Sequence, residues 1–163
     1  MNNTPFSSKE GTLEHIRRVN QLLIGCSKEI LDRAVKHDAT KIVEPELSGF
    51  NHLDPDFRKL SYGSPEYFNI VNKPEVQKAI AHHHKHNSHH PEHYEEGIMD
   101  MNMFDIIEML CDWKAASERN TSEDNKFGQH LEYNYKRYKI PIDIQIIISN
   151  TAKVLGFIPS DHD

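Results

Sequence analysis

The sequence predicts an all-α fold: one compact helical domain of about six or seven helices that spans residues 1–163. Apolar residues recur at three- and four-residue steps through most of the chain, which is the spacing of one helix face. A pair of segments that alternate apolar and polar residues, as a β-sheet requires, is not evident. With 37% apolar residues, a chain of 163 residues can bury one core and is hardly long enough for two.

The first helical pattern covers residues 12–37, and Thr12 is a suitable N-cap. The pattern is interrupted at residues 25–27. Gly25 can close a helix in the left-handed conformation and Ser27 can cap the next one, so we expect a turn there.

The segment 39–73 contains several prolines and glycines among large apolar residues, which predicts loops and short helices that pack rather than a linker. Pro74 suits the first turn of a helix that ends in a run of histidines. Further helices are expected over 102–119, 123–138 and 142–155. The last contains five isoleucines and resembles a strand in composition, but it has no evident partner strand.

Charge and hydropathy exclude several classes of protein. The formal net charge is −6, which disfavours binding to long nucleic acid and leaves a nucleotide-sized ligand possible. The sequence shows neither a membrane-spanning run nor a signal peptide, so we expect a cytoplasmic protein without membrane contact, in an oligomeric state left open. Cys26 and Cys111 lie in apolar helical surroundings and are expected to be buried thiols.

Histidine is the outlier of the composition. The chain has 12, and seven of them fall between His82 and His93. The run is internal and flanked by patterned sequence, which favours metal binding over a purification tag or a solvated tract. His86 and His93 are the members expected to remain in solvent.

The dipeptide His37-Asp38 ends the second predicted helix. A nitrogen and an oxygen ligand side by side can serve one or two first-row metal ions if the backbone turns at that point. His15 and His37 are each 11 residues from the expected turn, so an antiparallel helix pair would bring them to the same level. A continuous helix would hold them about 33 Å apart, so a site containing both requires the turn.

Later ligand-type residues follow helical spacing. His83 lies on the apolar face of its helix, and His89 and His90 precede Pro91 in what should be a defined loop. A helix face further on carries three carboxylates, of which the one at 112 is expected to be the most buried. The three carboxylates are Asp105, Glu108 and Asp112. Asp112 serves either as a metal ligand or in a structural ion pair.

In order and helix placement these motifs resemble the HD-domain superfamily of metal-dependent phosphohydrolases. Glu14-His15-Ile16 and His37-Asp38-Ala39-Thr40-Lys41 look like its first two motifs, and the stretch from His82-His83 to Asp112 looks like the later ones. The resemblance covers residues 12–119, the expected metal-site core, and leaves the C-terminal helices 123–155 outside. The chain also resembles small uncharacterised bacterial and phage proteins.

The resemblance implies a site with one or two divalent transition ions (Fe, Mn, Co, Ni or Zn) that activate a water to attack phosphorus. It implies a first metal held by His15, His37, Asp38 and Asp112, and a second held by His83 with His89, His90 or both. Asp38 would be catalytic, and Lys41, one turn later, could contact a phosphate oxygen.

Three functions stay open at this stage. The first is hydrolysis of a nucleotide or another small phosphoester by a metal-activated water. The second is a di-iron oxygenase on the same scaffold, and the third is a non-enzymatic histidine-rich protein that binds a metal or another ligand.

Overall fold

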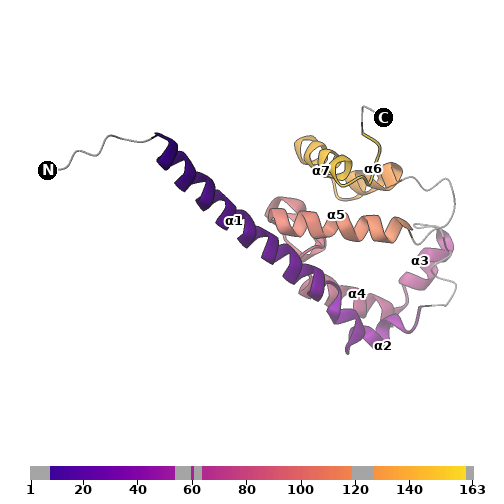
Figure 1. Cartoon of the computed structure of the whole chain (residues 1–163). Helices are drawn as coiled ribbons and strands as arrows, with labels where there is room; N and C mark the ends of the chain where they lie inside the picture. The colour runs from indigo at the N-terminus through magenta and orange to yellow at the C-terminus, as the bar shows by residue number, and fades with distance from the viewer. Residues whose placement is uncertain (1–7, 54–59, 61–63, 119–126, 161–163) are drawn as a thin grey trace. The chain divides into compact units, whose positions relative to one another are not determined.

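A computed structural model describes residues 8–53, 60, 64–118 and 127–160. Within these ranges all regular structure is helical, which confirms the all-α prediction (Figure 1). The α-helices are α1 Ser8–Lys36, α2 Glu46–Phe50, α3 Pro65–Val71, α4 Pro74–His86, α5 Met103–Glu118, α6 Phe127–Arg137 and α7 Ile142–Val154, and short 3-10 helices cover η1 Ala39–Ile42, η3 Pro91–His93 and η4 Gly97–Asp100. None of the described helices is both long enough and apolar enough to cross a membrane.

Internal contacts divide the described chain into two units, one ending at Lys36 and one beginning at His37. The first unit is α1, a continuous helix of 29 residues, so the predicted turn at residues 25–27 is wrong. The hydroxyl of Ser27 donates to the carbonyl of Leu23 at 3.0 Å, one turn earlier in the same helix, instead of capping a new one. Thr12 bonds back to Ser8 in the same way, and the helix begins at Ser8.

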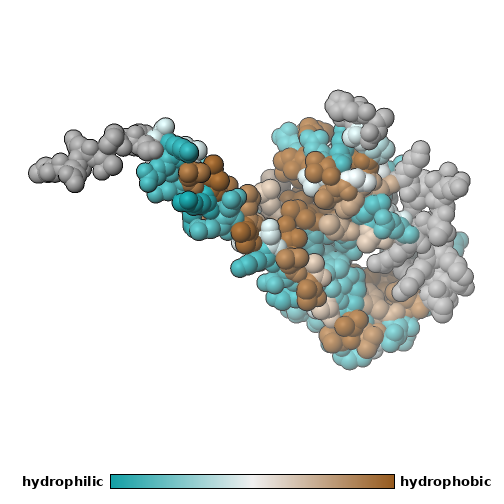
Figure 2. Space-filling view, in the orientation of Figure 1, coloured by the Kyte–Doolittle hydropathy of each residue, from teal (hydrophilic) through white to brown (hydrophobic). Residues whose placement is uncertain are grey.

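None of the residues of α1 is buried. Apolar side chains such as Leu23 and Ile30 are exposed along it. Figure 2 shows brown, hydrophobic groups along this helix. The cysteines also differ from expectation, because Cys26 and Cys111 are both free and exposed.

The second unit has its main core where α5, α6 and α7 meet (Figure 1). The predicted apolar stripe of α5 supplies Met109, Leu110 and Trp113, all buried. The isoleucine-rich segment forms the helix α7 and not a strand. Its buried residues, Ile148 and Ala152, are one helical turn apart, while Ile147 is exposed. The predicted single domain, with a metal-site core over residues 12–119 and C-terminal helices over 123–155, stays a prediction.

The short helix α2 packs closely against α4. Gly49 makes this approach possible, since an added Cβ there would overlap the Cβ of Ala79 and lie 2.9 Å from the carbonyl of Glu75. Pro74 starts α4, as the sequence predicts, with its missing N–H at a position that needs none. The packing directs one face of α2 at the histidines near the end of α4.

Candidate metal centre

The backbone of Asp38 departs from helical geometry. It is left-handed (φ 55°, ψ 14°), a conformation that aspartate tolerates better than most residues. This residue separates the end of α1 from η1, so the side chains of His37 and Asp38 approach the same region. A metal site that uses both side chains requires such a turn of the backbone.

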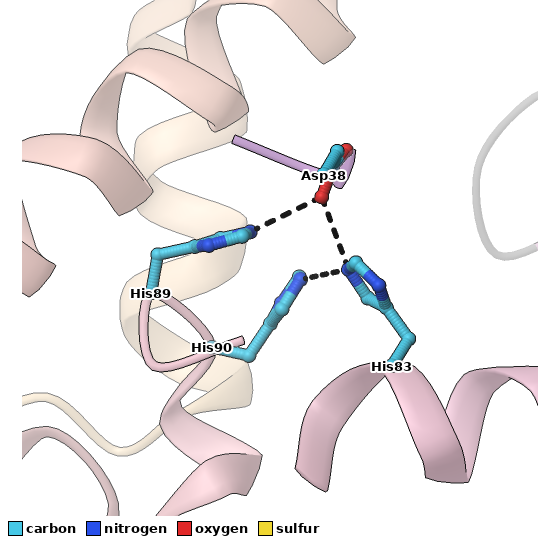
Figure 3. A group of neighbouring side chains, drawn as sticks. All are labelled: Asp38, His83, His89 and His90. Carbon is cyan, nitrogen blue, oxygen red and sulfur yellow. Dashed lines mark hydrogen bonds and ion pairs between the residues drawn. The ribbon is translucent and has the colours of Figure 1, made fainter. Parts of the chain in front are cut away.

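Three histidines converge on Asp38 (Figure 3). The Oδ1 atom of Asp38 lies 3.2 Å from Nε2 of His83 and 3.6 Å from Nε2 of His89. The Nε2 atom of His90 lies 2.8 Å from Nε2 of His83. We call Asp38, His83, His89 and His90 the inner group; each offers one ligand atom, and these atoms lie within 4.8 Å of one another.

Two atoms at the centre of the inner group have no hydrogen-bond partner although they are buried: Asp38 Oδ1 and His89 Nε2. Burying an unpaired polar atom costs about 1–3 kcal/mol, so such atoms call for a specific explanation. A cation between them would satisfy both. The inner group can therefore hold a metal ion.

A buried carboxylate orients one of these rings from behind. Glu46 is completely buried, and its Oε2 accepts from Nδ1 of His83 at 2.9 Å and from the hydroxyl of Thr40 at 2.9 Å. Its other oxygen lies 2.7 Å from Nδ1 of His82. With Nδ1 held in this way, His83 presents Nε2 to the inner group, the arrangement typical of metal-binding histidines.

Glu108 on α5 likewise orients the ring of His89. Its Oε1 lies 3.1 Å from Nδ1 of His89 and 2.9 Å from Nδ1 of His37. Both rings then direct Nε2 away from the carboxylate. Of the two, His89 faces Asp38 Oδ1, whereas His37 faces the other oxygen of the same aspartate.

A second combination of ligands lies beside the first: His37, Asp38 and Asp112. Nε2 of His37 is 3.5 Å from Oδ2 of Asp38 and 3.7 Å from Oδ1 of Asp112. The two carboxylate oxygens of Asp38 thus serve different groups. The Nζ of Lys41 donates to Oδ2 of Asp38 at 2.6 Å, so a cation already neutralises this side.

The electrostatics of these groups favour positive charge. The carboxylates of Asp112 and then Glu108 raise the pKa of His37 to about 10. Burial by itself would raise the pKa of Asp38, but His83 and Lys41 hold it well below its usual range. Burial and neighbouring histidines lower the pKa of His90 to about 2, which keeps it a neutral imidazole with a free lone pair.

The loop that carries two of the ligands is fixed by Asp105. Its Oδ1 accepts from the hydroxyl of Ser88 at 2.6 Å, and its Oδ2 accepts from the hydroxyl of Tyr94 at 2.8 Å. Oδ2 also accepts from the backbone N–H of Asn102, whose own side chain caps the first turn of α5. These bonds hold both ends of the segment that includes His89 and His90.

The structure brings together most of the predicted site residues but not His15. That residue is exposed on α1, 21 residues before Lys36, so it lies about 32 Å from Lys36, the last residue of this continuous helix. The predicted four-residue set with His15 is therefore wrong within one chain. The expected order of burial is also wrong, because Asp105 is fully buried and Asp112 only partly.

Reasoning from the sequence missed the two orienting carboxylates. The position of Glu108 on the same helix face as Asp112 indicated a possible role in the site. Glu46 lies in a proline-rich segment whose sequence gives no such indication. His86 and His93 are exposed, and their Nδ1 atoms bond to backbone carbonyls of α4, consistent with the prediction that they stay in solvent.

Fold and site together define an all-α protein whose histidines and carboxylates can hold a metal ion. The chain belongs to a family of unknown function, DUF5662, whose profile matches residues 4–155. Searches of curated proteins and of solved structures give no match.

Proposed function

We propose that this protein is a metal-dependent phosphohydrolase that acts on a nucleotide or another small phosphoester. The observation that carries the proposal is the pair of buried, unpartnered atoms in the inner group, Asp38 Oδ1 and His89 Nε2. Asp38 Oδ1 makes an ion-pair contact with Nε2 of His83 at 3.2 Å but no hydrogen bond, whereas buried polar atoms of a purely structural cluster are normally hydrogen-bonded. The separation of 3.6 Å between Asp38 Oδ1 and His89 Nε2 is too long for a hydrogen bond and suits two ligands of one ion.

The distances support this interpretation. Ligand atoms about 2.0–2.1 Å from a tetrahedrally bound zinc ion lie about 3.3 Å from one another. The distances from Asp38 Oδ1 to His83 and His89 fall on either side of that value. Mixed imidazole and carboxylate ligands suit Fe, Mn, Co, Ni and Zn, and these are the ions we propose.

The sharing of Asp38 supports room for two ions. One of its oxygens belongs to the inner group and the other faces His37 and Asp112. A carboxylate that serves two ligand groups through different oxygens can bridge two cations. The second group offers three protein atoms, which leaves positions for water or substrate.

Hydrolysis is the proposed chemistry because the order of the motifs resembles that of HD-domain phosphohydrolases. When bound, the metal would supply an activated water and positive charge for the phosphate oxygens. Lys41, held on Asp38, lies beside the second group and can turn its ammonium group toward an anionic substrate. Asp112 and Glu108 keep the imidazole of His37 in place.

Elemental analysis combined with a hydrolysis screen tests the proposal. The screen uses p-nitrophenyl phosphates, mononucleotides and cyclic dinucleotides with the metal found in the purified protein. Asp38→Asn keeps the shape of the side chain and removes its charge, so we expect a folded protein without retained metal or turnover. The control is His86→Ala, which lies outside the ligand groups and should behave as the parent.

Three results would contradict the proposal. A parent protein that retains less than one metal ion per chain and gains none on incubation would remove its basis. Retained iron without hydrolysis of any phosphoester would instead favour the oxygenase alternative. Full turnover in Asp38→Asn would show that the histidines act without the proposed centre.

A further inference from the structure

A third set of ligand-type side chains lies at the surface, next to the inner group: His84, His90 and Glu92. His84 is the residue after His83 on α4, and Glu92 lies in η3, two residues after His90. Each of the three offers one ligand atom, and these atoms lie within 4.8 Å of one another. We call these three residues the outer group.

We propose that the outer group is a loading site: it binds a divalent transition ion from solvent and passes it to the inner group through His90. The role in loading rests on the metal centre of the proposed function, whereas binding at the outer group does not.

Burial gives the first argument. The side chains of His83 and His89 are 3% and 2% exposed, so a hydrated ion cannot reach both directly. Glu92 is exposed and His84 is half-buried, which makes the outer group the accessible side of the cluster. An ion that exchanges its waters for these ligands has lost part of its hydration shell before it moves inward.

The position of His90 gives the second argument, because this residue belongs to both groups. Its ring centroid is 4.9 Å from that of His84 and 4.7 Å from that of His83. An ion can therefore keep His90 as a ligand while it exchanges the two outer ligands for inner ones. In this transfer the ion takes the place of the hydrogen bond between Nε2 of His90 and Nε2 of His83.

The carboxylate of the outer group is itself held in place. Oε1 of Glu92 accepts from Nη2 of Arg137 and from the hydroxyl of Tyr138, both at 3.1 Å. The other oxygen, Oε2, takes part in neither bond. A ligand fixed in this way from the neighbouring helix end loses less freedom on binding an ion than a solvated glutamate does.

Cobalt uptake tests the proposal. The protein is freed of metal with a chelator, checked for folding by circular dichroism, and mixed with Co²⁺, whose absorption reports ligand binding. The variants are His84→Ala and Glu92→Gln, with His86→Ala on the same helix as matched control. We expect the two variants to load about tenfold more slowly than the control and to retain the same final Co²⁺ content after desalting.

Loading of both variants at the rate of His86→Ala would overturn the proposal. Slow loading in Glu92→Gln alone would also overturn it, because the defect would then come from the lost bond to Arg137 and not from a lost ligand. Slow loading in His84→Ala, which leaves that bond intact, supports it.

Asp38→Asn separates this proposal from the proposed function. We expect this variant to retain no Co²⁺ after desalting but to keep the weaker Co²⁺ binding that equilibrium titration detects in the parent. If the parent itself retains none, the metal centre fails, and with it the role in loading. Binding at the outer group then stands only if His84→Ala lowers the Co²⁺ bound in the same titration.

Discussion

Oε1 of Glu108 lies 3.1 Å from Nδ1 of His89, and the same oxygen is 2.9 Å from Nδ1 of His37. One carboxylate oxygen therefore orients a ring of the inner group and a ring of the second group. The rings also contact each other, with centroids 4.6 Å apart. A substitution of Glu108 should therefore alter the metal affinity of both proposed positions.

The first prediction is that Glu108→Gln weakens metal binding by about 10- to 100-fold without unfolding the protein. The amide can still accept one bond, but it lacks the charge that makes the imidazoles better ligands. Competition with a chelator measures the affinity of parent and variant.

Glu118→Gln is the matched control, since this glutamate lies at the end of the same helix and pairs only at the surface, with Lys114 at 3.0 Å. It should keep the affinity of the parent. Equal affinities for Glu108→Gln and Glu118→Gln would mean that the carboxylate of Glu108 has no part in metal binding.

The second prediction concerns the loop fixed by Asp105. Asp105→Asn replaces one buried acceptor oxygen by a donor, so at least one of its hydroxyl and N–H partners loses its bond. We expect a loss of about 1–3 kcal/mol in unfolding free energy, measured by urea denaturation, together with weaker metal retention. Asp100→Asn is the control, because that exposed carboxylate bonds only to the backbone N–H of Glu96 in this region. Unchanged stability and metal content in Asp105→Asn would refute the positioning role.

The third prediction tests the approach of α2 to α4. Gly49→Ala introduces a Cβ into the space of Ala79, and overpacking of this kind costs about 1–3 kcal/mol. Because Glu46 lies one turn before Gly49 on the same face, its bond to His83 should loosen and metal affinity should fall. Gly128→Ala on α6, where a Cβ meets nothing within 4 Å, should leave both properties unchanged. A melting temperature equal to that of the parent in Gly49→Ala would rule out the close packing.

Helical periodicity predicted most of the described fold. The helices α4, α5 and α7 begin and end within a few residues of the expected bounds, because their apolar stripes and Pro74 are local signals. The exception is α1. Gly25 and Ser27 permit a turn but do not require one, and a glycine inside a helix costs only about 1 kcal/mol. The strong helix formers on both sides, such as leucine, glutamate, lysine and arginine, outweigh that cost.

The residues of the candidate site that could be predicted are those whose type alone marks them as metal ligands. His37, Asp38, His83, His89 and His90 stand out in the sequence, and the structure brings all five close to one another. Glu46 could not be found in this way, because its role depends on packing between α2 and α4 that only the folded chain shows.

The fourth prediction is that stability of the metal-free protein falls as the pH rises from about 7 to 10. Its cause is His37, whose pKa is raised from 6.5 to about 10 by the neighbouring carboxylates of Asp112 and then Glu108. The folded state holds this proton more tightly than the unfolded chain. The stabilisation is therefore complete below pH 6.5 and lost as the pH rises through about 10.

Melting temperatures of chelator-treated protein across this range measure the effect. His37→Asn cannot bind the proton and should show a flatter profile. Added metal should flatten the profile of the parent too, because the ion takes the place of the proton. Identical slopes for metal-free parent and His37→Asn would count against the prediction.

The fifth prediction tests the continuity of α1. Alanine is favoured over glycine inside a helix by about 1 kcal/mol, and a Cβ at Gly25 meets nothing within 4 Å, so Gly25→Ala should raise helix content and thermal stability in circular dichroism. Gly97→Ala is the contrasting variant: its φ of +59° is strained for alanine, and it should lower stability. A loss of stability in Gly25→Ala like that in Gly97→Ala would indicate a left-handed residue 25 and hence a turn. His15 would then return to the level of His37, and the four-residue metal site would be possible again.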